Sequence, residues 1–97
     1  MASLTVIHWR AIPSQVMAGT GRGATRHLLS DRFQEAIDQA AMRAGLQGTD
    51  EYLGEWRRQA RPCGDDLQAA VAAEAERLER DYDDERLAAL VRANGDG

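Results

Sequence analysis

The feature that most constrains this fold is the position of strand-forming sequence along the 97 residues. Residues 3–10 are mostly β-branched, aromatic or aliphatic, which is typical of a strand. Both faces of this segment carry apolar side chains, so we expect it to be covered on both sides near its start. Short strands are also expected at residues 15–18 and 24–29. Every later segment has helical spacing, so the first 29 residues are expected to supply the whole sheet.

Two breaks divide this strand-forming part. Pro13 cannot donate a hydrogen bond to a sheet ladder, so residues 12–14 are expected to form a turn or a strand edge. Gly19, Gly21 and Gly23 alternate with other residues, and glycine accepts positive φ angles without a Cβ clash. They are therefore expected to form a hairpin loop. Together the breaks predict a small antiparallel sheet made of the first strand and a hairpin.

The rest of the chain is expected to form a series of capped helices. The first runs from residue 30 or 31 to Gly45, and a short second helix spans residues 49–60 with Tyr52 and Trp56 on its apolar side. Residues 61–64 break the chain, and further helices begin near residues 65 and 83. The predicted fold class is α+β, a sheet of two to three strands followed by three to four helices packed on it. Residues 1–94 are expected to form one domain, and residues 95–97 a frayed tail.

The charge of the chain is unevenly distributed. The net charge is −4, and all twelve basic residues are arginines. Residues 1–62 hold eight arginines and six acidic residues, whereas residues 63–97 hold four arginines and ten acidic residues. An acidic total argues against general binding to nucleic acid, although it leaves room for a local arginine patch in the first half. We interpret the acidic helices as a solvated face, with docking to a basic partner as the alternative.

The sequence contains few groups that could bind a metal. Cys63 is the single cysteine, so it can form neither an internal disulfide nor a thiolate zinc site. The two histidines are isolated, and His8 shares a strand face with Leu4 and Val6, so it is interpreted as a packed core residue. No metal or cofactor is predicted. No apolar run approaches the length of a membrane span, so we expect no membrane association and a cytoplasmic location.

Two motifs resemble those of a known bacterial family. The first is Trp9-Arg10-x-Ile12-Pro13-x-Gln15-Val16 with the Gly/Arg loop after it. The second is Arg32-Phe33-x-x-Ala36-Ile37-Asp38-x-Ala40-Ala41-Met42, followed by Tyr52-Leu53-x-x-Trp56-Arg57. Together they are similar to the bacterial "virulence factor" domain family, and the similarity covers residues 3–92.

This resemblance implies little about chemistry. The family comprises small stand-alone proteins and relatives fused to helical-repeat proteins, among them a conserved virulence factor of Gram-positive cocci. Its name records a phenotype, so no catalytic or binding residue carries over to this chain. Stand-alone relatives often lie among genes of one-carbon and corrinoid methyl transfer, which implies an association with that metabolism and no more.

The glycine loop also fits a loose form of the dinucleotide fingerprint, as Gly19-x-Gly21-x-x-Ala24. That fingerprint must end a strand and open a helix, because the helix N-terminus holds the pyrophosphate. Here a strand is expected to follow the loop. We therefore prefer a plain hairpin tip over a nucleotide site.

Three arginines near this loop form the candidate anion site. Arg10, Arg22 and Arg26 would converge if the hairpin folds beside the first strand. With Gln15 they would hold a carboxylate or phosphate through forked hydrogen bonds. The alternative is ion pairing with acidic groups of the protein itself or of a partner. Candidate interaction residues are Trp9, Trp56 and Arg57.

The sequence contains no recognisable set of residues for nucleophilic or acid–base catalysis. The leading prediction is therefore a non-enzymatic accessory or protein-interaction module that acts with a larger protein. The alternative is a small-anion or cofactor-fragment binding protein that assists a one-carbon or methyl-transfer enzyme.

Overall fold

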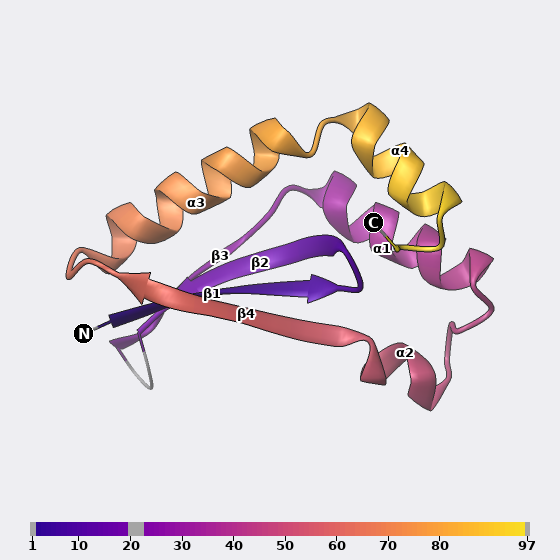
Figure 1. The fold of residues 1–97 in the computed structure, drawn as a ribbon, viewed down its shortest axis with the longest axis horizontal. Coiled ribbons are helices and arrows are strands. Elements are labelled where there is room, and N and C mark those ends of the chain that lie inside the picture. The colour runs from indigo at the N-terminus through magenta and orange to yellow at the C-terminus, as the bar shows by residue number, and fades with distance from the viewer. Residues whose placement is uncertain (1, 20–22, 97) are drawn as a thin grey trace.

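The computed structural model describes residues 2–19 and 23–96. The elements in chain order are β1 (Ala2–Trp9), β2 (Ile12–Ala18), β3 (Thr25–Leu28), α1 (Asp31–Arg43), α2 (Asp50–Gly54), β4 (Trp56–Cys63), α3 (Leu67–Asp81) and α4 (Asp84–Arg92). The strands form one antiparallel sheet in the order β3-β2-β1-β4. Helix α3 lies along the sheet, and α1 packs against both β2 and α4 (Figure 1). The predicted α+β class is confirmed, but the sheet has four strands and not two to three.

The fourth strand corrects the expected second helix. Helix α2 ends at Gly54, and residues 56–63 pair along the whole of β1, from Trp9 opposite Trp56 to Ala2 opposite Cys63. The sheet therefore does not come only from the first 29 residues. The break expected at residues 61–64 begins later, because Pro62 lies within β4. Proline is tolerated there since β4 is an edge strand and one side of its backbone faces no partner strand.

The first hairpin also turns earlier than expected. Arg10 and Ala11 form the turn, and Arg10 has a φ of 52°, in the left-handed region. Strand β2 already begins at Ile12, so residues 12–14 belong to the strand, with a register shift next to them opposite Ile7 and His8. Gly19 follows β2 with a φ of 84°, which agrees with its expected place in a loop. The rest of the glycine loop, Thr20 to Arg22, lies outside the described residues.

The hydrophobic core lies on one face of the sheet. Paired residues of an antiparallel sheet point to the same side, and the pairs Leu4–Ala18 and Val6–Val16 are all buried. The helices cover this face with the apolar stripes that their sequence spacing predicts. The helical contributors include Phe33, Ile37, Ala40, Val71, Ala75, Leu78, Leu87 and Leu90.

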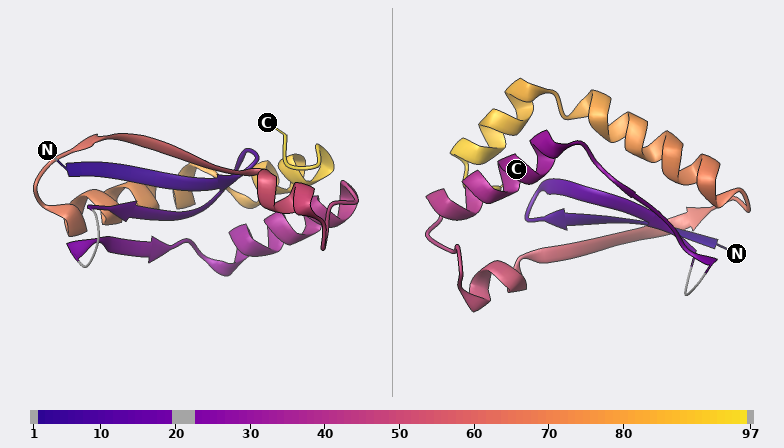
Figure 2. Two further views of the ribbon diagram at one scale, coloured as in Figure 1. Left: turned by 90° about the horizontal axis from the view of Figure 1, so that it is seen from below. Right: turned by 180° about the vertical axis from the view of Figure 1, so that it is seen from behind.

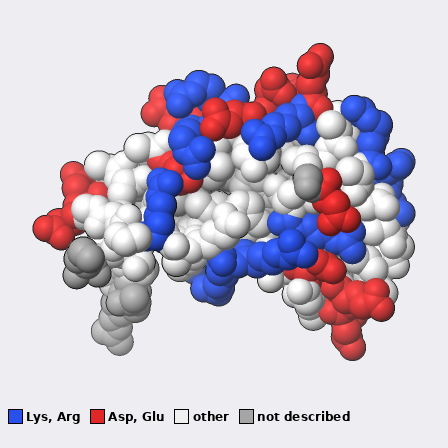
Figure 3. All heavy atoms as spheres, viewed as in Figure 1, with Lys and Arg blue, Asp and Glu red and all other residues white. Residues whose placement is uncertain are grey.

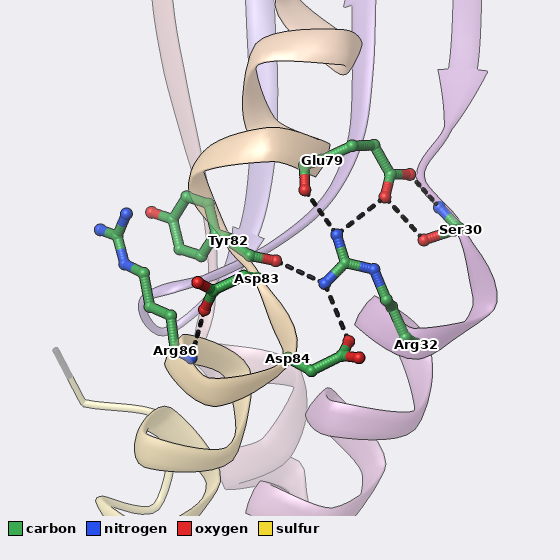
Figure 4. A network of polar contacts seen from close by, with 7 residues as sticks. All are labelled: Ser30, Arg32, Glu79, Tyr82, Asp83, Asp84 and Arg86. Atoms are coloured by element: carbon green, nitrogen blue, oxygen red, sulfur yellow. Dashed lines mark hydrogen bonds and ion pairs between the residues drawn. The ribbon is translucent and has the colours of Figure 1, made fainter.

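One arginine joins the ends of three helices (Figure 4). The Arg32 guanidinium, from α1, donates to the backbone oxygens of Glu79 and Tyr82 at the end of α3. It also pairs with the carboxylates of Glu79, at 3.1 Å, and Asp84, at 3.3 Å. Glu79 in turn accepts from the backbone N–H of Ser30 at 2.7 Å and from its hydroxyl at 2.8 Å. This junction satisfies backbone groups that helix ends leave without partners.

The C-terminal segment folds back onto the first hairpin. Ala11 donates its backbone N–H to the carbonyl of Gly95 at 2.8 Å, and Gly95 donates to Leu90 at 2.7 Å. Asp96 pairs with Arg10 at 3.6 Å. Residues 95 and 96, which were expected to fray, are thus attached to the domain. Among residues 2–19 and 23–96, no helix is long and apolar enough to cross a membrane.

Candidate functional site

The face of the sheet opposite the core has no helix over it (Figure 2, left). Side chains alternate along a strand, so the neighbours of the buried residues on β1 and β2 point to this second face. The strand pairing extends it to β3 and β4. We call this surface the open face; it consists of Ser3, Thr5, Ile7, Gln15, Met17, Arg26, Leu28, Arg58, Ala60 and Pro62. None of these ten residues is buried. The expectation that β1 is covered on both sides is therefore wrong.

The open face has an apolar centre between two arginines. One row across the four strands reads Arg58, Ile7, Gln15 and Leu28, and the next reads Ala60, Thr5, Met17 and Arg26. Strands lie about 4.8 Å apart, so the two arginines stand at opposite edges of a surface about 14 Å wide. Leu28 is 67% exposed, although it is a large aliphatic side chain.

The charge on the open face has one sign. Arg26 and Arg58 are its only ionisable residues, and neither forms an ion pair within the described part of the chain. Near the centre, the Oε1 atom of Gln15 is buried and has no hydrogen-bond partner among the described residues. The face can therefore accept carboxylates at its two edges and apolar side chains between them.

The structure divides the residues of the expected anion site. Gln15 and Arg26 share the open face, whereas Arg10 lies at the β1–β2 turn. Arg10 stands five positions beyond Thr5, in whose row Arg26 lies, which is about 17 Å along a strand. Arg22, the fourth residue of the predicted site, lies outside the described residues.

Arg10 already has partners of its own. Its guanidinium donates to the backbone oxygen of Asn94 at 2.9 Å and pairs with Glu55 and Asp96, each at 3.6 Å. It also lies over the Trp9 ring, 5.1 Å from the ring centroid. Arg10 therefore fastens the C-terminal segment to the first hairpin, which agrees with the alternative reading of ion pairing within the protein.

The expected interaction residues fall into two groups. Trp9 is fully buried, its indole N–H donates to the backbone oxygen of Tyr52 at 2.9 Å, and the two rings lie 5.6 Å apart. Trp56 is half-buried and meets Tyr52 edge-on at 6.1 Å. These aromatic rings connect α2 to β1 and β4. Arg57 is exposed and pairs with Glu55, but the register places it opposite His8, on the other side of the sheet from Arg58.

Sequence reasoning missed the residues that form the centre of the open face. Ile7 lies on a strand that was expected to be packed on both faces. Met17, Leu28 and Arg58 were not proposed as site residues. A signal was present in the β1 sequence, because Thr5 and Ile7 share a face that differs from the Leu4 and Val6 face. The pairing of β4 with β1, which brings Arg58 to this face, carries no such signal.

The comparison with known proteins agrees with the motifs. The sequence model of the family described as "Virulence factor" matches residues 7–91, which include β2, β3, α1, α2, β4 and α3 in full. No curated protein and no solved structure matches the chain. No group of three or more histidine, cysteine, aspartate or glutamate side chains within the described ranges is placed to hold a metal ion. Because the match spans most of the chain, this protein belongs to the Virulence factor family.

Proposed function

We propose that the protein is a non-enzymatic interaction module, and that its open face docks on an acidic, partly apolar surface of a larger protein. The observation that supports this most is the group of apolar side chains that no helix covers, Ile7, Met17 and Leu28, on a sheet whose other face holds the core. Contiguous exposed apolar surface on a small soluble domain is typical of a protein contact site.

The arginines favour an acidic partner. Arg26 and Arg58 stand at the two edges of the open face, and guanidinium groups pair with carboxylates through forked hydrogen bonds. Charges at the edge of an interface mainly select the partner and speed its association. The protein as a whole has a net charge of −4, which repels an acidic partner at a distance. The attraction therefore comes from the two arginines of this face.

The same charges argue against a second copy of the chain as the occupant. A two-fold symmetric dimer places the same patch of both subunits in contact. The open face would then bring arginines toward arginines, with no acidic residue of its own to offset them. A different protein with carboxylates around an apolar centre fits better.

The face, and not the sheet edge, is the favoured contact. Charged side chains and proline on an edge strand oppose the addition of a further strand. The edge strand β4 carries Arg57, Arg58, Arg61 and Pro62. The other edge strand, β3, is only four residues long.

The test compares two leucines of equal exposure. Leu28 on the open face is 67% exposed, and Leu53 on α2 is 65% exposed, so Leu28→Glu and Leu53→Glu differ mainly in position. Tagged wild type and both variants are used to capture proteins from a lysate of the source cells. We expect Leu28→Glu to reduce recovery of the main partner roughly tenfold or more, and Leu53→Glu to retain it.

Charge reversal at Arg26 and Arg58 supplies the second arm of this test. Arg26→Glu with Arg58→Glu should weaken capture to a similar extent, and more strongly at low salt than at high salt. Equal recovery with Leu28→Glu and wild type would rule out the open face as the contact. A wild-type dimer that Leu28→Glu converts to monomer would assign the face to self-association instead.

A further inference from the structure

A groove lies on the helix side of the sheet, between α3 and β4. Helix α3 packs on β1, β2 and β3, while β4 extends the sheet beyond it. The register turns Arg57, Gln59 and Arg61 of β4 toward the helix side, yet all three are exposed. Figure 1 looks into the space between α3 and β4, and the same view in Figure 3 shows a hollow with an uncharged floor. Charged side chains line both of its borders.

The hollow consists of two adjoining cavities, and the larger of the two reaches the size of a small-molecule site. One cavity of about 240 Å³ is formed by Leu4 and Val6 from β1, Gln59 and Arg61 from β4, and Arg77 from α3. A second cavity of about 420 Å³ shares Leu4, Arg61 and Arg77 with the first. Small-molecule sites are typically concave, mostly apolar and about 300–1,000 Å³ in volume, with a few polar groups that orient the ligand.

A buried carboxylate holds two guanidinium groups at this hollow. Glu74 on α3 is only 4% exposed, and it accepts hydrogen bonds from Arg61 at 2.9 Å and from Arg77 at 2.9 and 2.6 Å. The hydrogen bonds from Arg77, together with the charge of Arg61, lower the pKa of Glu74 against the opposing effect of burial. Glu74 is therefore ionised at neutral pH and fixes the positions of both arginines.

Arg61 keeps donors for a ligand. Its side chain is 59% exposed, and only its Nη2 atom bonds Glu74. The Nε and Nη1 atoms have no hydrogen-bond acceptor among the described residues. The amide of Gln59, two positions away on the same side of β4, adds a further polar group at the cavity.

The charges and the floor of the groove select the kind of ligand. Glu74 and Asp81, which accepts from Arg77 at 3.2 Å, offset the charges of Arg61 and Arg77. The groove therefore lacks the excess of positive charge that a phosphate dianion needs. A carboxylate carries a single charge and matches the planar edge of a guanidinium. Cys63 on β4 and Ala70 and Ala73 on α3 line the second cavity without being buried, and they offer apolar surface to the rest of such a molecule.

We propose that the groove between α3 and β4 binds a small organic monocarboxylate. Its carboxylate accepts from a free N–H of Arg61 beside Gln59, and its hydrocarbon part lies along Ala70 and Ala73 of α3. The groove and the open face lie on opposite sides of the sheet. Failure of one proposal therefore leaves the other standing.

The test uses hexanoate as the probe, followed by amide chemical shifts of ¹⁵N-labelled protein. We expect saturable shifts at residues 4–6, 59–61 and 74–77, with a dissociation constant of about 1 mM. Hexanamide has nearly the same shape without the charge, so it should bind roughly tenfold or more weakly. Inorganic phosphate should also bind more weakly, because it cannot use the apolar floor.

Two variants of the same strand separate a binding role of Arg61 from a merely structural one. Arg61→Gln should weaken hexanoate roughly tenfold, while Arg58→Gln, on the other face of β4, should leave it unchanged. Unchanged amide spectra away from the groove would show that each variant is folded. The proposal is overturned by the absence of saturable shifts with hexanoate, by equal binding of hexanamide, or by unchanged hexanoate binding in Arg61→Gln.

Discussion

At the scale of single residues, Gly95 packs directly against the buried ring of Trp9 and covers this part of the core. Gly95 has a φ of 91°, and a Cβ atom added to it would lie 2.8 Å from Cζ3 of Trp9. Its backbone bonds both Ala11 and Leu90. A left-handed φ and close contact with a fully buried ring both require glycine here. The end of the described chain therefore forms part of the core around Trp9.

The first prediction concerns this glycine. Gly95→Ala should lower the free energy of unfolding by about 1–3 kcal/mol, because alanine is strained at this φ and its methyl group meets Trp9. Gly54→Ala is the control, since Gly54 has open space around its Cα and no positive φ. Urea unfolding measures both variants. Equal stability of Gly95→Ala and wild type would show that the C-terminal segment does not pack on Trp9.

The second prediction concerns His8, whose Nδ1 atom is buried without a hydrogen-bond partner among the described residues. Burial lowers the pKa of His8 below the ordinary 6.5, although a backbone hydrogen bond at Val6 and the charge of Glu74 act in the opposite direction. The folded protein thus binds this proton less tightly than the unfolded chain does. Stability should therefore decrease as the pH falls below about 6.5 toward the folded-state pKa.

Substitution of this histidine tests the assignment. His8→Gln should remove the decrease in unfolding free energy between about pH 7 and pH 5, because no group at this position then titrates. His27→Gln, which changes an exposed residue of β3, should keep it. Denaturant unfolding at several pH values measures the slope. A slope that persists in His8→Gln would assign the pH dependence to other groups.

At the scale of elements, the ends of α1, α3 and α4 depend on Arg32. It is 29% exposed and bonds two backbone oxygens and two carboxylates. Burial disfavours the charge of Glu79, but the hydrogen bonds from Ser30 and Arg32 outweigh it, so the pKa of Glu79 lies below its ordinary value. The motif that begins at Arg32 and Phe33 therefore has a structural explanation.

The third prediction follows from this junction. Arg32→Ala should lower the free energy of unfolding by about 1.5–3 kcal/mol, because it leaves Glu79 and the backbone oxygens at the end of α3 without their donor. Arg32→Lys should recover only part of the loss, since an ammonium group cannot reach all of these acceptors at once. Arg80→Ala, which removes an exposed arginine near the end of α3, serves as the control in thermal unfolding. An equal effect of Arg32→Ala and Arg80→Ala would contradict the structural role.

The elements also show how far the sequence determines this fold. Helices α1, α3 and α4 have clear apolar stripes and caps, so their ranges were predicted closely. Strand β4 was missed because most of its residues are exposed on both faces of an edge strand. It therefore lacks the alternation that marks a half-buried strand. Its arginines, glutamine and alanine are good helix formers, which made residues 56–60 look like a continuation of α2.

The candidate site was predictable only in part for the same reason. Gln15 and Arg26 were named from their residue types, and the structure places both on the open face. Arg58 reaches that face only through the pairing of β4 with β1, which joins residues 51 positions apart at Ile7 and Arg58. Long-range pairing of this kind leaves no local pattern in the sequence. The groove beside α3 is lined by the same strand, β4, so it could not be predicted from the sequence either.

At the scale of the whole molecule, the uneven charge of the sequence serves partly to join its two halves. Arginines of the basic first half pair with acidic groups of the second half in Arg10–Asp96, Arg32–Glu79, Arg32–Asp84 and Arg61–Glu74. The acidic helices are thus not only a solvated face. Arg26 and Arg58 of the open face have no such partners within the described chain, in contrast to Arg10, Arg32 and Arg61.

The last prediction concerns acid stability. The pKa values of Glu74 and Glu79 lie below the ordinary 4.5, so the folded state binds these protons less tightly than the unfolded chain. Their stabilisation is present above about pH 4.5 and is lost as the pH falls through the folded-state values. Glu74→Gln should be less stable than wild type at neutral pH, because Arg61 and Arg77 lose their shared carboxylate. It should also lose less stability on acidification from pH 5 to about pH 3.

The measurement is the unfolding free energy across this acid range, with Glu35→Gln as the control because Glu35 is exposed on α1. The control should follow the wild-type curve. Glu74 is buried, so added salt should screen its contribution less than that of the more exposed pair Arg57–Glu55. A Glu74→Gln curve parallel to wild type below pH 5 would place the acid sensitivity elsewhere. A reduced slope would mean that one buried carboxylate both joins α3 to β4 and limits acid stability.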